Sequence, residues 1–191
     1  GDQPDGATVR AGGAGNLTID GRGGTAAEGD LNHGVVVGGG ASASVGSGDL
    51  QITGAGGGSA ASGYNYGVSV DSAGVITSTG SGNVNVIGTG GNGSGDHNYG
   101  VRLHGVNSQL TSSGGDVTVT GQGGGTGVSS DNIGVVVSGA ARVAAGGTGT
   151  TQLNGTGGLT DGSHNKGISI WNENTIVTSA GGDVILSGQG G

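Results

Sequence analysis

A four-residue pattern, Asn-x-Gly followed by Val or Ile, recurs along the chain. Its copies begin at Asn32, Asn65, Asn98, Asn132 and Asn165, so that successive copies lie 33 or 34 residues apart. A fixed period of this length is the signature of a repeat architecture, in which each repeat is one structural unit that stacks on its neighbours. A chain of this kind is expected to fold as a stack of similar units.

A second pattern keeps the same register as the first. It begins with Asp, Asn or Thr, continues into a short segment rich in aliphatic residues, and again repeats every 33 or 34 residues. The copies are Asn16–Ile19, Asp49–Ile52, Asn83–Val86, Asp116–Val119, Thr150–Leu153 and Asp183–Leu186. Two independent patterns that share one period exclude a chance repeat.

Both patterns predict short β-strands. In Val68-Ser69-Val70 and Val101-Arg102-Leu103, aliphatic residues flank a polar one, which is the alternation of a strand with one buried face. A weaker apolar segment lies between the two patterns in several periods, at Val75–Thr77, Gln109–Thr111, Arg142–Ala144 and Thr175–Val177. No segment has the apolar period of a helix. Each period is therefore expected to hold three strands.

The composition limits the kind of core that these strands can form. Of the 191 residues 53 are Gly, 2% are aromatic, and Phe, Met and Cys are absent. Strands wound as successive coils place equivalent residues about 4.8 Å apart in columns. Small aliphatic columns then fill a narrow interior without large rings. We predict an all-β fold, a β-solenoid of five to six coils with about 33 residues and three short strands per coil, which forms one domain over residues 1–191.

The repeated Asn and Gly have separate expected roles. The Asn column is predicted to form a structural ladder, in which side-chain amides hydrogen-bond along the solenoid axis. The corner Gly two residues later is expected to permit either a positive φ or a close approach of backbones. These glycines are Gly34, Gly67, Gly100, Gly134 and Gly167.

Charge and hydropathy exclude two classes of partner. The formal net charge is -8, from 13 acidic and 5 scattered basic residues, which argues against a nucleic-acid partner. No apolar run of about 18 residues is present, so we expect no membrane insertion. The chain starts at Gly1 without Met and stops without a recognisable cap. We expect either a piece of a longer solenoid or end-to-end stacking of copies, with residues 1–6 as a junction or partial cap.

Carboxylates do not form an evident catalytic cluster. Glycosidase chemistry needs paired carboxylates on adjacent coils. The recurring acids Asp49, Asp116 and Asp183 alternate with Asn and Thr at equivalent positions, which favours turn formation over proton transfer. We therefore predict no catalytic, cofactor-binding or metal-binding residues. An incidental Ca²⁺ ion is the alternative kept open, because Gly114-Gly115-Asp116 matches part of a calcium-binding β-roll repeat.

Few aromatic side chains are present, and most of them share one region of the repeat. Tyr66 and Tyr99 occupy the same position in adjacent periods, Tyr64 lies beside them, and Trp171 ends a later strand. Two interpretations remain open: the rings cover a corner of the solenoid, or they contact a glycan or another partner. His97 and His164 share a position two periods apart, too far to hold one metal, and are expected to be solvated.

The segments Gly114–Gly121 and Gly181–Gly188, in the pattern Gly-Gly-Asp-Val-Thr-Val-Thr-Gly, resemble the repeat region of filamentous-haemagglutinin-type adhesins and related giant bacterial surface proteins. The resemblance extends over about the whole chain. It implies a right-handed parallel β-helix, export to the bacterial cell surface and an adhesive or spacer function.

These observations favour a rigid, non-enzymatic extracellular rod of a bacterial surface adhesin. Its expected partners are neighbouring repeats or other copies of the chain, and surface glycans or other cells. A subunit of a self-assembling extracellular filament is the main alternative. A carbohydrate-active β-helix enzyme is the third.

Overall fold

The computed structural model describes residues 6–25 and 29–191. These residues contain strands β1 to β17 and no helix. In sheet A, the strands in chain order are β1 (Thr8–Ala11), β4 (Ser42–Val45), β7 (Val75–Ser78), β10 (Gln109–Ser112), β13 (Arg142–Ala145) and β16 (Ile176–Ser179). In sheet B they are β2 (Leu17–Arg22), β5 (Leu50–Ala55), β8 (Val84–Thr89), β11 (Val117–Gln122), β14 (Thr151–Thr156) and β17 (Val184–Gln189). In sheet C they are β3 (Val35–Val37), β6 (Val68–Val70), β9 (Val101–His104), β12 (Val135–Ser138) and β15 (Ile168–Trp171).

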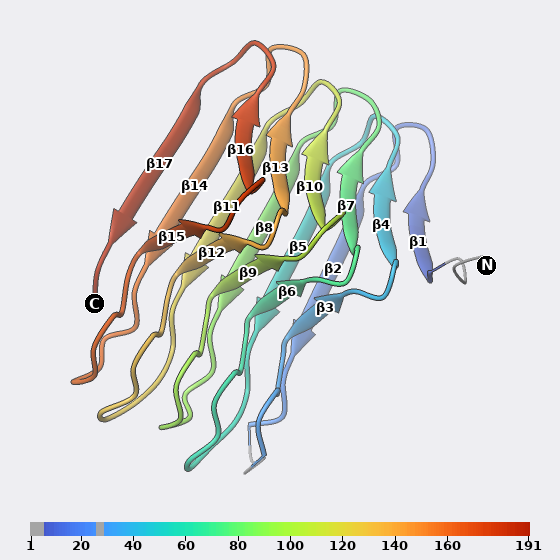
Figure 1. Ribbon diagram of the computed structural model, residues 1–191. Coiled ribbons are helices and arrows are strands. Elements are labelled where there is room, and N and C mark those ends of the chain that lie inside the picture. Colours follow the sequence, from blue (N-terminus) through green and yellow to red (C-terminus); the bar gives the residue numbers. More distant parts are fainter. Residues whose placement is uncertain (1–5, 26–28) are drawn as a thin grey trace.

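The three sheets are the walls of a parallel β-solenoid. The chain passes through sheets A, B and C in turn, and every strand pairs with the equivalent strand of the next coil in parallel (Figure 1). In that view the strands of sheet A rise in front, those of sheet B descend behind, and each later coil lies further left. The winding is therefore right-handed. The predicted fold class, with three strands per coil, is confirmed.

The register of the sheets follows the sequence period. Val68 pairs with Val101, and Val117 pairs with Val84 and Thr151, so each residue lies beside its equivalent one period away. Aliphatic residues of all three sheets point inward and form one continuous core. Side chains such as Val68, Val84, Leu110 and Leu153 have no exposed surface. Burial of these small columns is the main favourable term in the fold.

Two features of the strands differ from the sequence prediction. Strands β1 and β4 were not located by the sequence patterns, and in β4 the position equivalent to Ile76 and Leu110 is held by Ala43. The strands of sheet B also run further than the predicted segments, because each continues through the Gly that lies two residues beyond its segment. At Gly54 a Cβ would overlap the carbonyl of Gly67 in the returning chain, so this strand position excludes every larger residue.

The Gly-rich loops between sheets B and C are also stacked. They project from the lower edge of the solenoid in Figure 1, each leaving a sheet B strand and returning to sheet C. Backbone hydrogen bonds join successive loops, as from Gly57 N to Asn32 O at 2.7 Å and from Gly91 N to Asn65 O at 2.8 Å. The expected junction or cap at residues 1–6 lies outside the described residues, apart from Gly6.

Candidate functional site

The repeated Asn side chains line the inner edge where the loops meet sheet C. Asn65, Asn98 and Asn132 are fully or almost fully buried. Nδ2 of each of the first four Asn residues donates to Oδ1 of the Asn in the next coil, at distances of 3.1, 3.0, 3.1 and 3.2 Å. The same oxygens also accept the backbone N–H of the preceding Asn. The column therefore satisfies backbone and side-chain donors together in a buried place.

The corner glycines are required by close approach, not by a positive φ. None of Gly34, Gly67, Gly100, Gly134 and Gly167 has a φ in the left-handed region. A Cβ on Gly100 would instead overlap the backbone nitrogen of Gln122, and it would lie 2.6 Å from the carbonyl oxygen of Gly134. Of the two roles expected for these glycines, the second is the one that the geometry shows.

The left-handed residue of each corner is the one before the Asn, and sequence reasoning missed it. Its φ lies between 55° and 66° in every coil that has this corner. The positions are held by Leu31, Tyr64, His97, Asp131 and His164. Because none of them is Gly, composition gave no signal of the turn. The fixed geometry of the corner over-determines this strained conformation.

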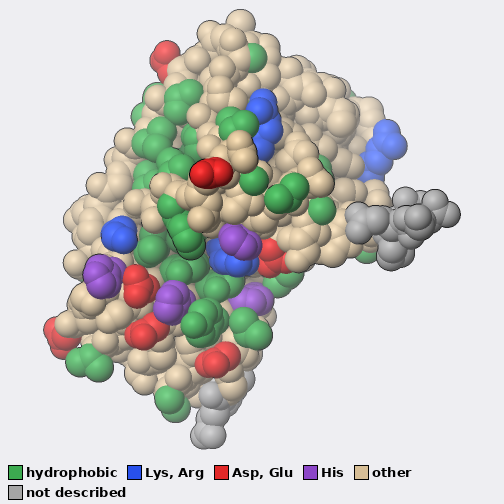
Figure 2. All heavy atoms as spheres, viewed as in Figure 1, with side chains coloured by type: hydrophobic (Ala, Val, Ile, Leu, Met, Phe, Trp, Pro, Cys, Tyr) green, Lys and Arg blue, Asp and Glu red, His purple; other side chains and the backbone are tan. Residues whose placement is uncertain are grey.

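The outer face of sheet C carries three of the four aromatic side chains, two histidines and three charged side chains. We define it by three rows that run along the axis. The row beside the loops is His33, Tyr66, Tyr99, Ile133 and Lys166; the middle row is Val36, Ser69, Arg102, Val136 and Ser169; the third row is Gly38, Asp71, His104, Ser138 and Trp171. Figure 2 shows histidine, basic and acidic side chains among apolar ones over these strands.

Rings in the first row form a stack along the solenoid axis. The ring centroids of His33 and Tyr66 are 4.7 Å apart, and those of Tyr66 and Tyr99 are 5.0 Å apart and nearly parallel. Beside this stack, the rings of Tyr64 and His97 stack at 4.8 Å, and His97 meets Tyr99 edge-on at 5.8 Å. Tyr66 is therefore enclosed by rings on both faces and is only 7% exposed. Both of its ring faces are closed to a ligand.

Arg102 lies at the middle of the outer face and contacts two residues of the preceding coil. Its guanidinium carbon lies 5.4 Å from the centroid of Tyr66, and Nη1 lies 3.3 Å from Oδ2 of Asp71. The hydroxyl of Ser69 donates to the same carboxylate oxygen at 3.0 Å. This cation–π contact and ion pair hold the Arg102 side chain beside Tyr66 and Asp71.

Burial changes the acid–base properties of the stack. Burial lowers the pKa of His33, and its Nδ1 accepts the backbone N–H of Tyr66 at 3.2 Å, which requires an unprotonated nitrogen. Burial also raises the pKa of Tyr66 and of Tyr99, the latter with a contribution from the neighbouring Tyr66 ring. The stack is therefore neutral at ordinary pH.

Beyond Tyr99 the stack ends in a groove of about 350 Å³. Its lining residues are His97, Tyr99, Asp131, Ile133, Val136, Lys166, Ser169 and Trp171. Trp171 is 54% exposed, whereas Ile133 and Val136 are buried and form the floor. His164 lies near one end, with Nδ1 3.8 Å from a carboxylate oxygen of Asp131. Sequence reasoning selected Tyr99 and Trp171 but did not bring them together in one hollow.

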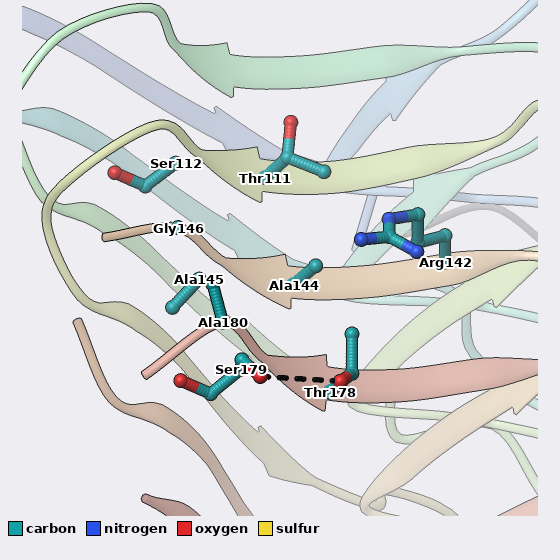
Figure 3. Close-up of a pocket in the computed structure, with 9 residues that line it drawn as sticks. All are labelled: Thr111, Ser112, Arg142, Ala144, Ala145, Gly146, Thr178, Ser179 and Ala180. Atoms are coloured by element: carbon teal, nitrogen blue, oxygen red, sulfur yellow. Dashed lines mark hydrogen bonds between the residues drawn. The ribbon is translucent and has the colours of Figure 1, made fainter. Parts of the chain in front are cut away.

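A second hollow, on the outer face of sheet A, has a simpler origin. Its volume is about 210 Å³, and it lies over β10, β13 and β16. Figure 3 shows Ala144 between Thr111 and Thr178, with Arg142 beside it. The hollow is the space left where Ala interrupts a column of Thr residues. Of its lining side chains, only Arg142 is charged.

The recurring Asp side chains accept hydrogen bonds from the backbone of the next coil. Oδ1 of Asp49 accepts the backbone N–H of Asn83 at 2.8 Å, and Oδ1 of Asp116 accepts that of Thr150 at 2.7 Å. Asn16 and Asn83 make the equivalent bond in other coils. Over the described ranges, no group of three or more His, Cys, Asp or Glu residues is placed to hold a metal ion.

Comparisons with known proteins do not place this chain in a family. No family model, no curated protein and no solved structure matches it. Within residues 6–25 and 29–191, no helix is long and apolar enough to cross a membrane. Any statement on function therefore depends on the solenoid and its outer face.

Proposed function

We propose that the chain is a rigid, non-enzymatic rod of a bacterial surface adhesin, exposed outside the cell. The observation that carries this proposal is the Asn ladder, which runs without a break from Asn32 to Asn165. Together with the parallel sheets, it fixes every coil to the next and makes a stiff support. The resemblance of Gly114–Gly121 to haemagglutinin-type adhesin repeats supports the same proposal.

The outer face of sheet C supports an adhesive role over a pure spacer role. Aromatic side chains are rare in this chain, yet three of the four, Tyr66, Tyr99 and Trp171, lie on this one face. Exposed aromatic groups beside polar ones are typical of recognition surfaces. A spacer has no need for such a face.

Adhesion of coated beads tests this proposal. Beads that carry the folded chain through a terminal tag are expected to attach to epithelial or bacterial cells in flow. Beads that carry the same chain after denaturation are the control for nonspecific attachment. Equal attachment by folded and denatured chains, on every cell type tested, would contradict an adhesive function.

A self-assembling extracellular filament is the second candidate. The last described coil exposes aliphatic side chains of β17 and one free edge of each sheet, and its exposed residues include Val184, Ile185 and Leu186. Further coils of a longer chain, or a second copy, would cover them. Negative-stain microscopy of the isolated chain separates these cases, because long filaments favour assembly and short dispersed rods favour the adhesin segment.

A further inference from the structure

The groove beside Tyr99 occupies a gap in a stack of rings. His33, Tyr66 and Tyr99 lie in successive coils with ring spacings of 4.7 and 5.0 Å. The next two residues of the same row are Ile133 and Lys166. Tyr66 covers one face of the Tyr99 ring, so the other face points toward these two residues. Because Ile is shorter than Tyr, the outer part of that ring face opens into the groove.

The space between the two walls of the groove has room for one ring. Tyr99 and Lys166 are two coils apart, which is roughly 10 Å along the axis. A ring inserted at the spacing of the existing stack would lie against Tyr99 and outside Ile133, and it would meet Lys166 and Trp171 on its other side. Ser169, Lys166 and Trp171 all belong to the coil that forms this second wall.

The polar groups around the gap include one negative and one positive side chain, and they offer both hydrogen-bond donors and acceptors. Asp131 offers carboxylate acceptors, Lys166 offers ammonium donors, and Ser169 offers a hydroxyl. His97 also lines the groove, and its Nδ1 is buried without a hydrogen-bond partner among the described residues. Asp131 disfavours an anionic ligand and Lys166 disfavours a cationic one. A neutral ring with several hydroxyl groups satisfies Asp131, Lys166 and Ser169 together.

We propose that this groove is a binding site for one neutral pyranose ring of a saccharide, which stacks on the free face of Tyr99 and contacts Trp171, while Asp131, Lys166 and Ser169 bind its hydroxyl groups. An aromatic side chain of a partner protein has the right thickness but leaves these polar groups desolvated and unpaired, which is costly. The proposal rests on the adhesive function and specifies its ligand class.

The single Trp of the chain provides a direct measurement. Because Trp171 is the only Trp, its fluorescence reports on this groove alone. Neutral hexasaccharides of glucose, mannose and N-acetylglucosamine, each titrated into the folded chain, are the probes. At least one of them is expected to give a saturable change in Trp171 emission. No change with any of them, checked by calorimetry, would overturn the proposal.

A filling variant tests the gap itself. Ile133→Tyr continues the ring stack into the groove and is expected to weaken saccharide binding at least tenfold without lowering the melting temperature. Leu159→Ala, at a loop residue that is 83% exposed and outside the groove, is the matched control and keeps full binding. Binding that survives in a folded Ile133→Tyr chain contradicts the proposed site.

A second variant and a peptide probe complete the test of this site. If Ile133→Tyr does not fold, Lys166→Ala replaces it, because Lys166 is exposed and its loss is expected to weaken binding about tenfold. A Tyr-rich peptide that binds where every saccharide fails overturns the saccharide assignment. If the saccharides fail and coated beads still adhere, the groove is not the adhesive site and the proposed function stands.

Discussion

The side-chain oxygen of Asn132 accepts two hydrogen bonds from Asn98, one from its backbone N–H at 3.0 Å and one from Nδ2 at 3.1 Å. The side-chain oxygen of Asn98 accepts the equivalent two hydrogen bonds from Asn65 in the preceding coil. A buried ladder of this kind acts as a register device, because a shift of one residue between coils would leave several donors unpaired at once.

Removing one member of this ladder should therefore destabilise the rod. Asn98→Ala leaves the buried N–H of Asn65 without its acceptor, and it removes the Nδ2 donor to Asn132. We expect a loss of at least about 2 kcal/mol in the free energy of unfolding, measured by urea titration. Asn92→Ala, at an exposed Asn of the adjoining loop, is the matched control. Equal midpoints for the two variants would show that the ladder does not stabilise the fold.

A methyl group at a corner glycine should be tolerated even less. In Gly100→Ala the new Cβ meets backbone atoms of Gln122 and Gly134, which move only with their whole strands. We expect a cost of about 3 kcal/mol or more, seen as a large fall in melting temperature or loss of soluble protein. A Cβ at Gly12 meets no atom within 4 Å, so Gly12→Ala should behave as the unmodified chain.

The sequence was sufficient to predict the coils but not every strand within them. Equivalent residues pair directly across coils. The register can therefore be read from the positions equivalent to Asn98 and Val101 in each period. Strand β4 gave no signal because Ala43 holds the position of the large aliphatic residues Ile76 and Leu110, and the strand is fixed by its neighbours in sheet A. Its pairing with β7 decides its conformation more than its own propensity does.

The candidate site was predictable only in part. The rows of aromatic residues follow from the period, which places Tyr66 and Tyr99 in one column. The groove depends instead on the missing ring at Ile133, and on Trp171, which reaches the same hollow from a different row. Hollows of this kind arise from differences between repeats, whereas repeat analysis detects what the repeats share.

A strained turn between β12 and β13 offers a way to stabilise the chain. Ala140 has a φ of 66°, a conformation that is unfavourable for residues with a Cβ. Ala140→Gly removes this strain but increases the entropy of the unfolded chain, and we expect a net gain of up to about 1 kcal/mol. Ala141→Gly at the next, buried position is the matched control and should lose about 1 kcal/mol or more. A lower melting temperature for Ala140→Gly would contradict the strain argument.

Acid should weaken the first coils through His33. Its pKa is lowered in the folded chain by burial, the nearby Arg102 adds to this, and Asp71 opposes it. The folded state therefore binds fewer protons than the unfolded state between the two pKa values. The stability that the neutral ring provides is complete above the unfolded pKa of about 6.5 and is lost as the pH falls toward the folded pKa. Protonation of Nδ1 also removes the acceptor for Tyr66 N–H.

His33→Tyr is the variant that tests this expectation, since it keeps a ring in the stack and removes the titrating imidazole. The melting temperature is measured from pH 8 to pH 5 for both chains, and an NMR titration follows the His33 ring directly. We expect a smaller fall in melting temperature for the variant, and a midpoint for His33 below 6.5 in the unmodified chain. Because the difference at pH 8 reports packing alone, only the change with pH is compared. Parallel pH curves would show that His33 does not couple protonation to folding.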